Sequence, residues 1–184
     1  MIPNKVILLL AALTGVSLLQ AADATMPGLK VGEPAAAFTL KNSSGSDVSL
    51  ISLTQQGPVA LVFYRSAEWC PFCTRQLQAL QTDLAKIEQS GIRVVGISYD
   101  APEKSAAAAT KLGLTYPLLS DTGSKVIDAY GIRNKEAKGK AEGVPHPVVF
   151  IVDGQGIIRA KLMRDGYRER PESAEIVAAA MHLK

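Results

Sequence analysis

Two cysteines, Cys70 and Cys73, stand two residues apart in a chain of 184 residues that contains no other cysteine. A pair at this spacing can cycle between a dithiol and a disulfide, and the thiolate is its reactive form. We therefore predict a thiol–disulfide redox centre. Since the chain has no second pair, this one cannot belong to a network of structural disulfides.

Three other uses of the pair fit the sequence less well. A zinc site needs four ligands, and only His146 and His182 could join the cysteines, at a spacing that matches no zinc pattern. A static disulfide would close too short a loop to constrain the unfolded chain much. Inert buried thiols do not suit an oxidising compartment. We expect neither a metal ion nor an organic cofactor.

The pair lies where an apolar segment gives way to an amphipathic one. Residues 59–64 are apolar and predict a buried strand, and a polar bend follows them. A helix is predicted from Pro71 to Gln89, because one of its faces carries Leu77, Leu80, Leu84 and Ile87. Proline suits the first helical position. Free backbone N–H groups and the helix dipole stabilise a thiolate at such a helix start. Cys70 is therefore expected to be the more exposed, attacking thiolate, and Cys73 to resolve the mixed disulfide.

Side chains next to the pair are candidates for supporting roles. Trp69, the only tryptophan, is expected to form an apolar wall beside the thiolate, with core packing as the alternative. Phe72 lies between the cysteines, and its ring is expected to face a substrate. Arg65 and Glu68 either tune the thiolate in opposite directions or form an ordinary solvated ion pair.

The first 24 residues predict a secretory signal peptide. Lys5 supplies a positive start, residues 6–19 are mostly apolar, and Ala22-Asp23-Ala24 is a small-residue cleavage site. An uncleaved membrane anchor is the alternative, but the apolar segment is shorter than the roughly 20 residues that a spanning helix needs. We expect export to the periplasm or beyond it, with no stable membrane insertion after cleavage.

Residues 25–184 predict a single domain. A β-hairpin is expected from 36–40 and 48–50, followed by strands at 59–64, 92–98, 116–119, 147–152 and 157–163. Further helices are expected at 102–112, 124–130 and 171–181. This order predicts an α/β fold with a mixed central sheet and helices on both faces. The lysine-rich segment 133–142 predicts a solvated loop, and a formal net charge of +3 does not indicate nucleic acid binding.

The sequence Trp69-Cys70-Pro71-Phe72-Cys73 after an apolar strand resembles the thioredoxin superfamily. Residues 62–77 resemble its redoxin branch, the peroxiredoxin-like AhpC/TSA group, and the resemblance extends from about Gly32 to the C-terminus. It implies a thioredoxin-like fold for residues 25–184.

The resemblance also implies a cis proline opposite the cysteine pair. Its place before the strand at 147–152 matches Pro147, with Pro145 as a rival. Such a bond would leave the backbone of His146 free to pair with a substrate. The His146 imidazole would also be placed to exchange protons with the thiols, and an exposed loop imidazole is the alternative.

The sequence departs from typical peroxiredoxins in two places. Those proteins carry the pattern P-x-x-x-T-x-x-C, and with Cys73 as its last residue, Ser66 replaces the proline and Cys70 the threonine. Their peroxide-polarising arginine near the late strand is also not recognisable, because His146 and Pro147 occupy that neighbourhood. Peroxide chemistry needs donors aimed at the developing charge.

These departures favour one function over two others. The expected function is thiol–disulfide exchange with protein thiols or disulfides through Cys70 and Cys73. The first alternative is a thiol-dependent hydroperoxide reductase that uses the same cysteines on small peroxides. The second is a non-catalytic, redox-sensing binding domain. The electron donor or acceptor is not identified by the sequence.

Overall fold

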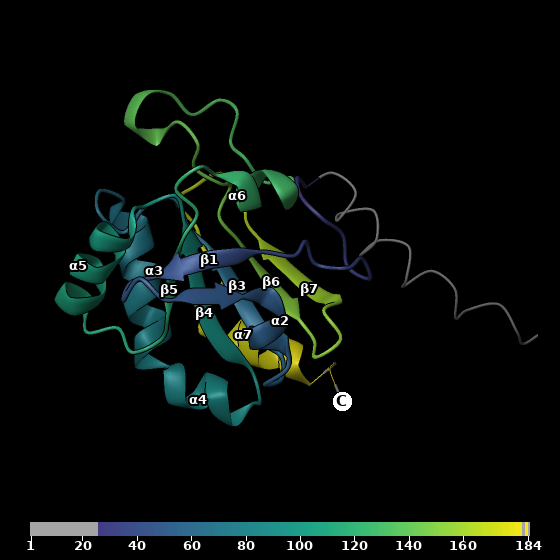
Figure 1. Cartoon of the computed structure of the whole chain (residues 1–184). Helices are drawn as coiled ribbons and strands as arrows, with labels where there is room; N and C mark the ends of the chain where they lie inside the picture. The colour runs from purple at the N-terminus through teal and green to yellow at the C-terminus, as the bar shows by residue number, and fades with distance from the viewer. Residues whose placement is uncertain (1–25, 182, 184) are drawn as a thin grey trace, which may run out of the picture.

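A seven-stranded mixed sheet forms the centre of the protein (Figure 1). The structure is a computed structural model, and it describes residues 26–181 and 183. The strand order across the sheet is β2-β1-β5-β4-β3-β6-β7. The signal peptide predicted for residues 1–24 lies outside the described residues. None of the helices in the described part of the chain is long and apolar enough to cross a membrane.

The sheet combines parallel and antiparallel neighbours, as the sequence predicts. β3 pairs in parallel with β4, and β4 with β5, whereas β6 runs antiparallel to both β3 and β7. The expected N-terminal hairpin is formed by β1 and β2, and β1 also pairs with β5. The strands are β1 Thr39–Asn42, β2 Asp47–Ser49, β3 Val59–Phe63, β4 Arg93–Ser98, β5 Leu118–Ser120, β6 Val148–Val152 and β7 Ile158–Met163.

The prediction of one helix from Pro71 to Gln89 is wrong, because the chain leaves helical geometry at Asp83 (φ −96°, ψ 6°). Aspartate is a weak helix former, and the Thr82 hydroxyl donates to the Gln78 carbonyl, a bond that bends helices. The helices are α2 Leu50–Thr54, α3 Pro71–Thr82, α4 Leu84–Gln89, α5 Pro102–Leu112, α6 Lys125–Ala129 and α7 Ser173–Ala180, with a 3-10 turn η1 at Gly139–Ala141.

Strand β3 is buried on both of its faces, which explains its unbroken apolar sequence. Ala60 and Val62 pack into the cluster that includes the apolar faces of α3, α4, α5 and α7. Leu61 and Phe63 pack into the opposite cluster with α2 and α6. Because side chains pack against both faces of β3, the loop that follows Phe63 begins at a fixed position.

Gly96 of β4 lies in close contact with the side chains of Leu118 and Tyr64, and only a residue without a side chain fits there. A β-carbon at this position would lie 2.6 Å from Leu118 Cδ2 and 3.1 Å from Tyr64 Cε1, and both of those side chains are buried. Replacing Gly96 by alanine therefore overpacks the core and should lower the free energy of unfolding by about 1–3 kcal/mol. Urea denaturation measures this change.

Gly123→Ala is the matched control for that substitution. Its β-carbon would meet only the Lys125 side chain, at 3.7 Å or more, so its effect should stay within about 0.5 kcal/mol. Equal stabilities of the two variants would contradict the close packing described for Gly96.

Candidate active site

Cys70 and Cys73 lie at the start of α3 and are joined by a disulfide, with their α-carbons 5.3 Å apart. Cys70 is the N-cap residue and Pro71 the first residue of the helix, as the sequence predicts. The backbone N–H groups of Cys73 and Thr74 both donate to the Cys70 carbonyl at 3.1 Å. The first turn therefore fixes both sulfurs relative to β3.

The expectation that Cys70 is the more exposed cysteine finds no support in the disulfide form, because both cysteines are buried. Cys70 is 1% exposed and Cys73 is 0% exposed. Both pack into the core cluster with Ala67 and Leu77, and Trp69 and Phe72 pack against the same cluster. A reactant can reach either sulfur only after a neighbouring side chain moves.

A buried carboxyl group shapes the loop that leads into the pair. Asp100 Oδ2 accepts a hydrogen bond from the Ala67 backbone N–H at 2.7 Å. The Ser66 hydroxyl oxygen accepts from the backbone N–H groups of Glu68 at 3.0 Å and Trp69 at 3.4 Å. Burial raises the pKa of Asp100, and the hydrogen bond from Ala67 partly opposes that effect. One titratable side chain, that of Asp100, therefore holds the backbone of this loop in place.

Trp69 is half-buried and is tied to two other segments. Its indole N–H donates to the Tyr99 hydroxyl at 2.9 Å, and that hydroxyl donates in turn to the Lys140 carbonyl. The Lys140 ammonium also lies 5.4 Å from the Trp69 ring centroid. The lysine-rich segment predicted as a solvated loop is therefore anchored beside the active site at this one residue.

Arg65 and Glu68 do not form the solvated pair that was one reading of the sequence. Glu68 forms an ion pair with Lys104 on α5. The Arg65 guanidinium carbon lies 4.9 Å from the Trp69 ring centroid and 4.5 Å from that of Tyr167, both cation–π distances. Arg65 thus adds positive charge to the side of the site where Tyr167 lies.

Arg170 was not among the residues predicted from the sequence, and it contacts the cysteine pair. Its Nη2 atom donates to Cys73 Sγ at 3.5 Å, and its Nη1 atom donates to the carbonyls of Tyr167 and Glu169. Burial, and then the nearby charge of Arg65, lower the pKa of Arg170 to about 10, so the group remains a cation at neutral pH. When the disulfide is reduced, this cation stabilises a thiolate at Cys73.

The amino-acid sequence gives little indication that Arg170 contacts Cys73. Arg170 stands 97 residues after Cys73, in an irregular segment between β7 and α7. No periodic pattern covers that segment, and several other arginines surround it in the sequence.

The expected cis bond at Pro147 or Pro145 is wrong, because no peptide bond in the described residues is cis. The backbone N–H of His146 donates to the Ile132 carbonyl at 2.7 Å, and Pro145 forms a bridge with Arg133. That N–H is therefore already paired within the chain and is not free for a substrate. Burial lowers the pKa of the half-buried His146 imidazole, which favours its neutral form.

Pro147 does lie at the edge of the sheet from which the active-site loop leaves. It precedes Val148, which is paired with Phe63 at the end of β3. Neither His146 nor Pro147 lines either of the two clefts beside the cysteine pair.

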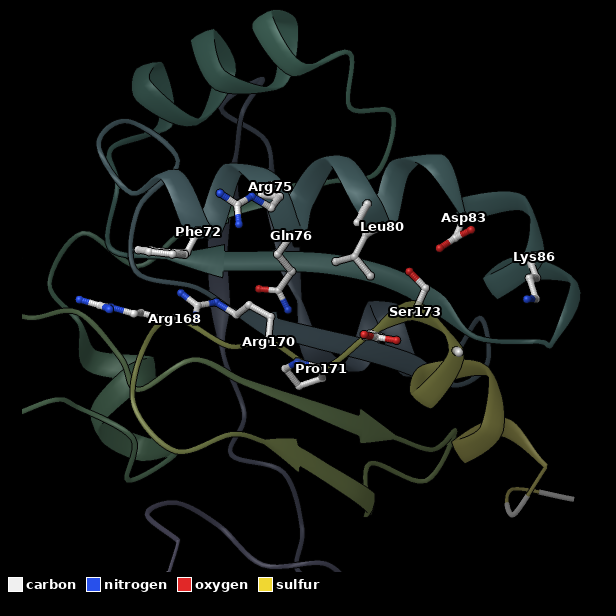
Figure 2. A pocket seen from close by; sticks show the side chains of 13 residues that line it. Phe72, Arg75, Gln76, Leu80, Asp83, Lys86, Arg168, Arg170, Pro171 and Ser173 are labelled. Atoms are coloured by element: carbon white, nitrogen blue, oxygen red, sulfur yellow. The ribbon is translucent and has the colours of Figure 1, made fainter.

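Two clefts flank the first turn of α3. The smaller, of about 280 Å³, reaches Cys70 and is bordered by Trp69, Pro71 and α5 residues. The larger, of about 430 Å³, begins at Phe72 and Arg170 and runs along α3 (Figure 2). Phe72 is half-buried, and its ring contacts Tyr167 edge-on at a centroid distance of 6.0 Å. Of the two clefts, only the smaller is lined by a cysteine. No group of three or more His, Cys, Asp or Glu side chains able to hold a metal ion occurs in residues 26–181.

The family model and the similar sequences of known proteins point to the same group of proteins. Residues 31–161 match the AhpC/TSA family. Peroxiredoxin Bcp of Escherichia coli is 34% identical over 134 residues, which cover 72% of this chain and 85% of that protein. A candidate peroxiredoxin of Mycobacterium tuberculosis is 39% identical over 132 residues, covering 71% of this chain and 82% of that protein.

Solved structures show the same fold. Peroxidoxin BcpB of Mycobacterium tuberculosis superposes with a TM-score of 0.75 at 24% identity, over 85% of this chain and 99% of that one. A candidate protein disulfide isomerase from Bacteroides thetaiotaomicron superposes with a TM-score of 0.66 at 25% identity, over 85% of this chain and 92% of that one. The thioredoxin-like fold predicted from the sequence is confirmed.

Replacing Arg170 by methionine tests its action on Cys73. In a Cys70→Ser background, alkylation of Cys73 by iodoacetamide should reach half of its maximal rate at a pH about 1–3 units higher with Arg170→Met, because the compensating cation is lost. Alkylation rates measured against pH give this midpoint. Lys125→Met, an exposed charge loss on α6, is the control, and an equal shift in that variant would contradict a local effect of Arg170.

Asp100 should make the stability of the fold depend on pH. Its pKa is raised in the folded state, so the folded protein binds this proton more readily than the unfolded chain does. Stability should therefore fall as the pH rises from about 3 through the raised pKa. Asp100→Asn keeps an oxygen that can accept from Ala67 and should lose this component. Urea denaturation of both proteins at several pH values measures it, and parallel curves would contradict the assignment.

Proposed function

The chain belongs to the AhpC/TSA family, and we propose that within it the protein is a hydroperoxide reductase that cycles Cys70 and Cys73 between dithiol and disulfide. It is an enzyme of the thiol-dependent oxidoreductase class. The peroxiredoxin names of its relatives support peroxide as the oxidant. This reverses the order expected from the sequence, in which disulfide exchange came first. The single observation that carries the proposal is the contact between Arg170 and Cys73 Sγ.

Arg170 supplies the positive group that the sequence lacked near its late strand. Attack on a peroxide requires a thiolate and a donor for the oxygen that leaves. A guanidinium 3.5 Å from Sγ can serve both needs, because it holds five N–H donors in a planar fork. Its Nε atom is buried and has no hydrogen-bond partner within the described chain.

The proposed cycle assigns peroxide attack to Cys73 and resolution to Cys70. The Cys73 thiolate attacks one peroxide oxygen, the O–O bond breaks, and the other oxygen leaves as water or an alcohol after taking a proton. Cys73 is now a sulfenic acid. The Cys70 thiol condenses with it, releasing water and forming the disulfide seen in the structure. Aligned on Cys73, the pattern P-x-x-x-T-x-x-C places its reactive cysteine at the same residue, although Ser66 and Cys70 replace its proline and its threonine.

Disulfide exchange with protein thiols remains the second candidate. The C-x-x-C pair at the start of α3 favours it, as does the similarity to the candidate disulfide isomerase at 25% identity. In that function the roles are reversed, since Cys70 at the helix start attacks and Cys73 resolves. The two functions therefore predict opposite phenotypes for the single cysteine variants.

Export is also part of the proposal. Its support is the sequence of residues 1–24, with a basic start, an apolar segment and a small-residue cleavage site. An exported form would work in the periplasm or outside the cell.

Single cysteine variants separate the two candidates. With dithiothreitol as reductant, Cys73→Ser should lower the rate of hydrogen peroxide consumption on the order of a thousandfold or more, because the nucleophile is lost. Cys70→Ser should keep the first peroxide turnover and accumulate a sulfenic acid that dimedone labels. Peroxide loss and mass spectrometry measure the two effects.

Two results would count against this assignment. If Cys73→Ser keeps peroxide reactivity and Cys70→Ser loses it, the roles of the cysteines are reversed. If the wild-type protein consumes no peroxide but reduces insulin disulfides, the second candidate function replaces the first.

A further inference from the structure

The segment that joins β7 to α7, residues 164–171, has few ties to the rest of the protein. Residues 165–169 are all exposed. Among the described residues, no backbone N–H or carbonyl group of 165–171 is hydrogen-bonded to another segment. Arg164 forms an ion pair with Glu175, which ties the segment to α7 and not to the active site. Its position beside the cysteine pair must therefore be set by side chains.

Tyr167 and Arg170 connect this segment to the active site. The Arg170 guanidinium contacts Cys73 Sγ at 3.5 Å. The Tyr167 ring meets the Phe72 ring edge-on at a centroid distance of 6.0 Å, and the Arg65 guanidinium carbon lies 4.5 Å from the Tyr167 centroid. Figure 2 shows Phe72 and Arg170 at the same end of the larger cleft. Since Tyr167 is the only large apolar side chain of the segment, it is the one that can anchor the segment by packing.

The hydrogen bonds of Arg170 do not fix its distance from the sulfur. Its Nη1 atom donates to the carbonyls of Tyr167 and Glu169, which belong to the same segment and move with it. The distance between the guanidinium and Cys73 Sγ therefore follows the position of the whole segment. An arginine side chain also has many rotamers, and holding it in one of them costs conformational entropy. A contact outside Arg170 must keep the segment against α3.

A neighbouring cation opposes the contact between Arg170 and the sulfur. The charge of Arg65 contributes to lowering the pKa of Arg170, which means that the two guanidinium groups repel each other. Arg75, Arg168 and Glu172 line the same cleft as Arg170. In the described part of the chain, Arg170 forms no ion pair with any carboxylate. Unless another group compensates the charge of Arg65, the repulsion drives the segment away from the cysteine pair.

Two aromatic rings supply that compensation. The Arg65 guanidinium carbon lies 4.9 Å from the Trp69 ring centroid and 4.5 Å from that of Tyr167. The face of an aromatic ring attracts a cation at such distances. Trp69 belongs to the active-site loop, whereas Tyr167 belongs to the segment before α7. The charge of Arg65 therefore draws this segment toward the loop through the Tyr167 ring, although it repels Arg170.

We propose that Tyr167 is a positioning residue that keeps Arg170 in contact with Cys73. Its ring does so by holding the segment against Arg65 and Phe72. The inference rests on the proposed function in one respect, namely that the Cys73 thiolate is the nucleophile. Tyr167 acts on the sulfur through Arg170. Without the ring, the segment moves outward and the thiolate loses part of its compensating charge.

Alkylation of Cys73 by iodoacetamide in a Cys70→Ser background tests this role. The pH at which the rate is half-maximal should rise by about 1 unit in Tyr167→Ala, because the compensating cation moves away from the thiolate. Tyr167→Phe keeps the ring and should leave this midpoint unchanged. Ile51→Ala removes an exposed apolar side chain from α2, on the opposite face of the sheet, and is the control. Its midpoint should match that of the Cys70→Ser parent.

A double variant shows whether Tyr167 acts through Arg170. Arg170→Met alone should raise the midpoint. Adding Tyr167→Ala to Arg170→Met should raise it no further, since the cation that Tyr167 positions is already gone. Rescue by Tyr167→Phe and the absence of an additive shift are results that a general loss of packing would not give.

Three results would overturn the inference: an unchanged midpoint in Tyr167→Ala, an equal rise in Tyr167→Phe, or a further rise when Tyr167→Ala is added to Arg170→Met. Alkylation needs no peroxide, so the outcome is separable from that of the proposed function. If the midpoints shift as expected but the protein consumes no peroxide with dithiothreitol, only the proposed function fails. If peroxide is consumed but Tyr167→Ala leaves the midpoint unchanged, only the positioning role fails.

Discussion

A half-buried guanidinium lies against one sulfur of a buried disulfide, and no carboxylate in the described chain compensates it. A charge removed from water is stable only where other groups replace its solvation. The carbonyls of Tyr167 and Glu169 accept hydrogen bonds from Arg170 and so replace part of its solvation. A thiolate at Cys73 would supply the full opposite charge. The same contact therefore favours the reduced state over the disulfide and the thiolate over the thiol.

The fold holds this contact from two directions. Strand β3 is buried on both faces, and it therefore fixes the position of the loop that begins at Arg65. Asp100 fixes that loop through the backbone of Ala67, so the first turn of α3 has a defined origin. Arg170 lies on the segment before α7. Helix α7 is itself held in place, because its Ile176 packs into the same core cluster as the cysteines. Loosening either support would alter the distance between guanidinium and sulfur.

The sequence predicted the local features of this site well and its long-range ones poorly. The strand, the helix start at Pro71 and the sheet were readable because burial and periodicity repeat over several residues. The break at Asp83 was not, since the apolar spacing continues through Leu84 and Ile87 across it. The cis proline was expected from resemblance alone, and the pairing of His146 with Ile132 shows that the segment is held in another way. Arg170 was missed because a single arginine in an irregular segment carries no pattern.

The central claim is that peroxide, and not a protein disulfide, is the preferred oxidant of the reduced pair. Stopped-flow measurement of Trp69 fluorescence tests it directly, because the only tryptophan adjoins Cys70. The fully reduced protein is mixed in turn with hydrogen peroxide and with an oxidised, scrambled protein substrate at equal concentrations. The account predicts that peroxide oxidises the pair faster and that Arg170→Met removes this advantage. Faster oxidation by the protein disulfide, unaffected by Arg170→Met, would contradict it.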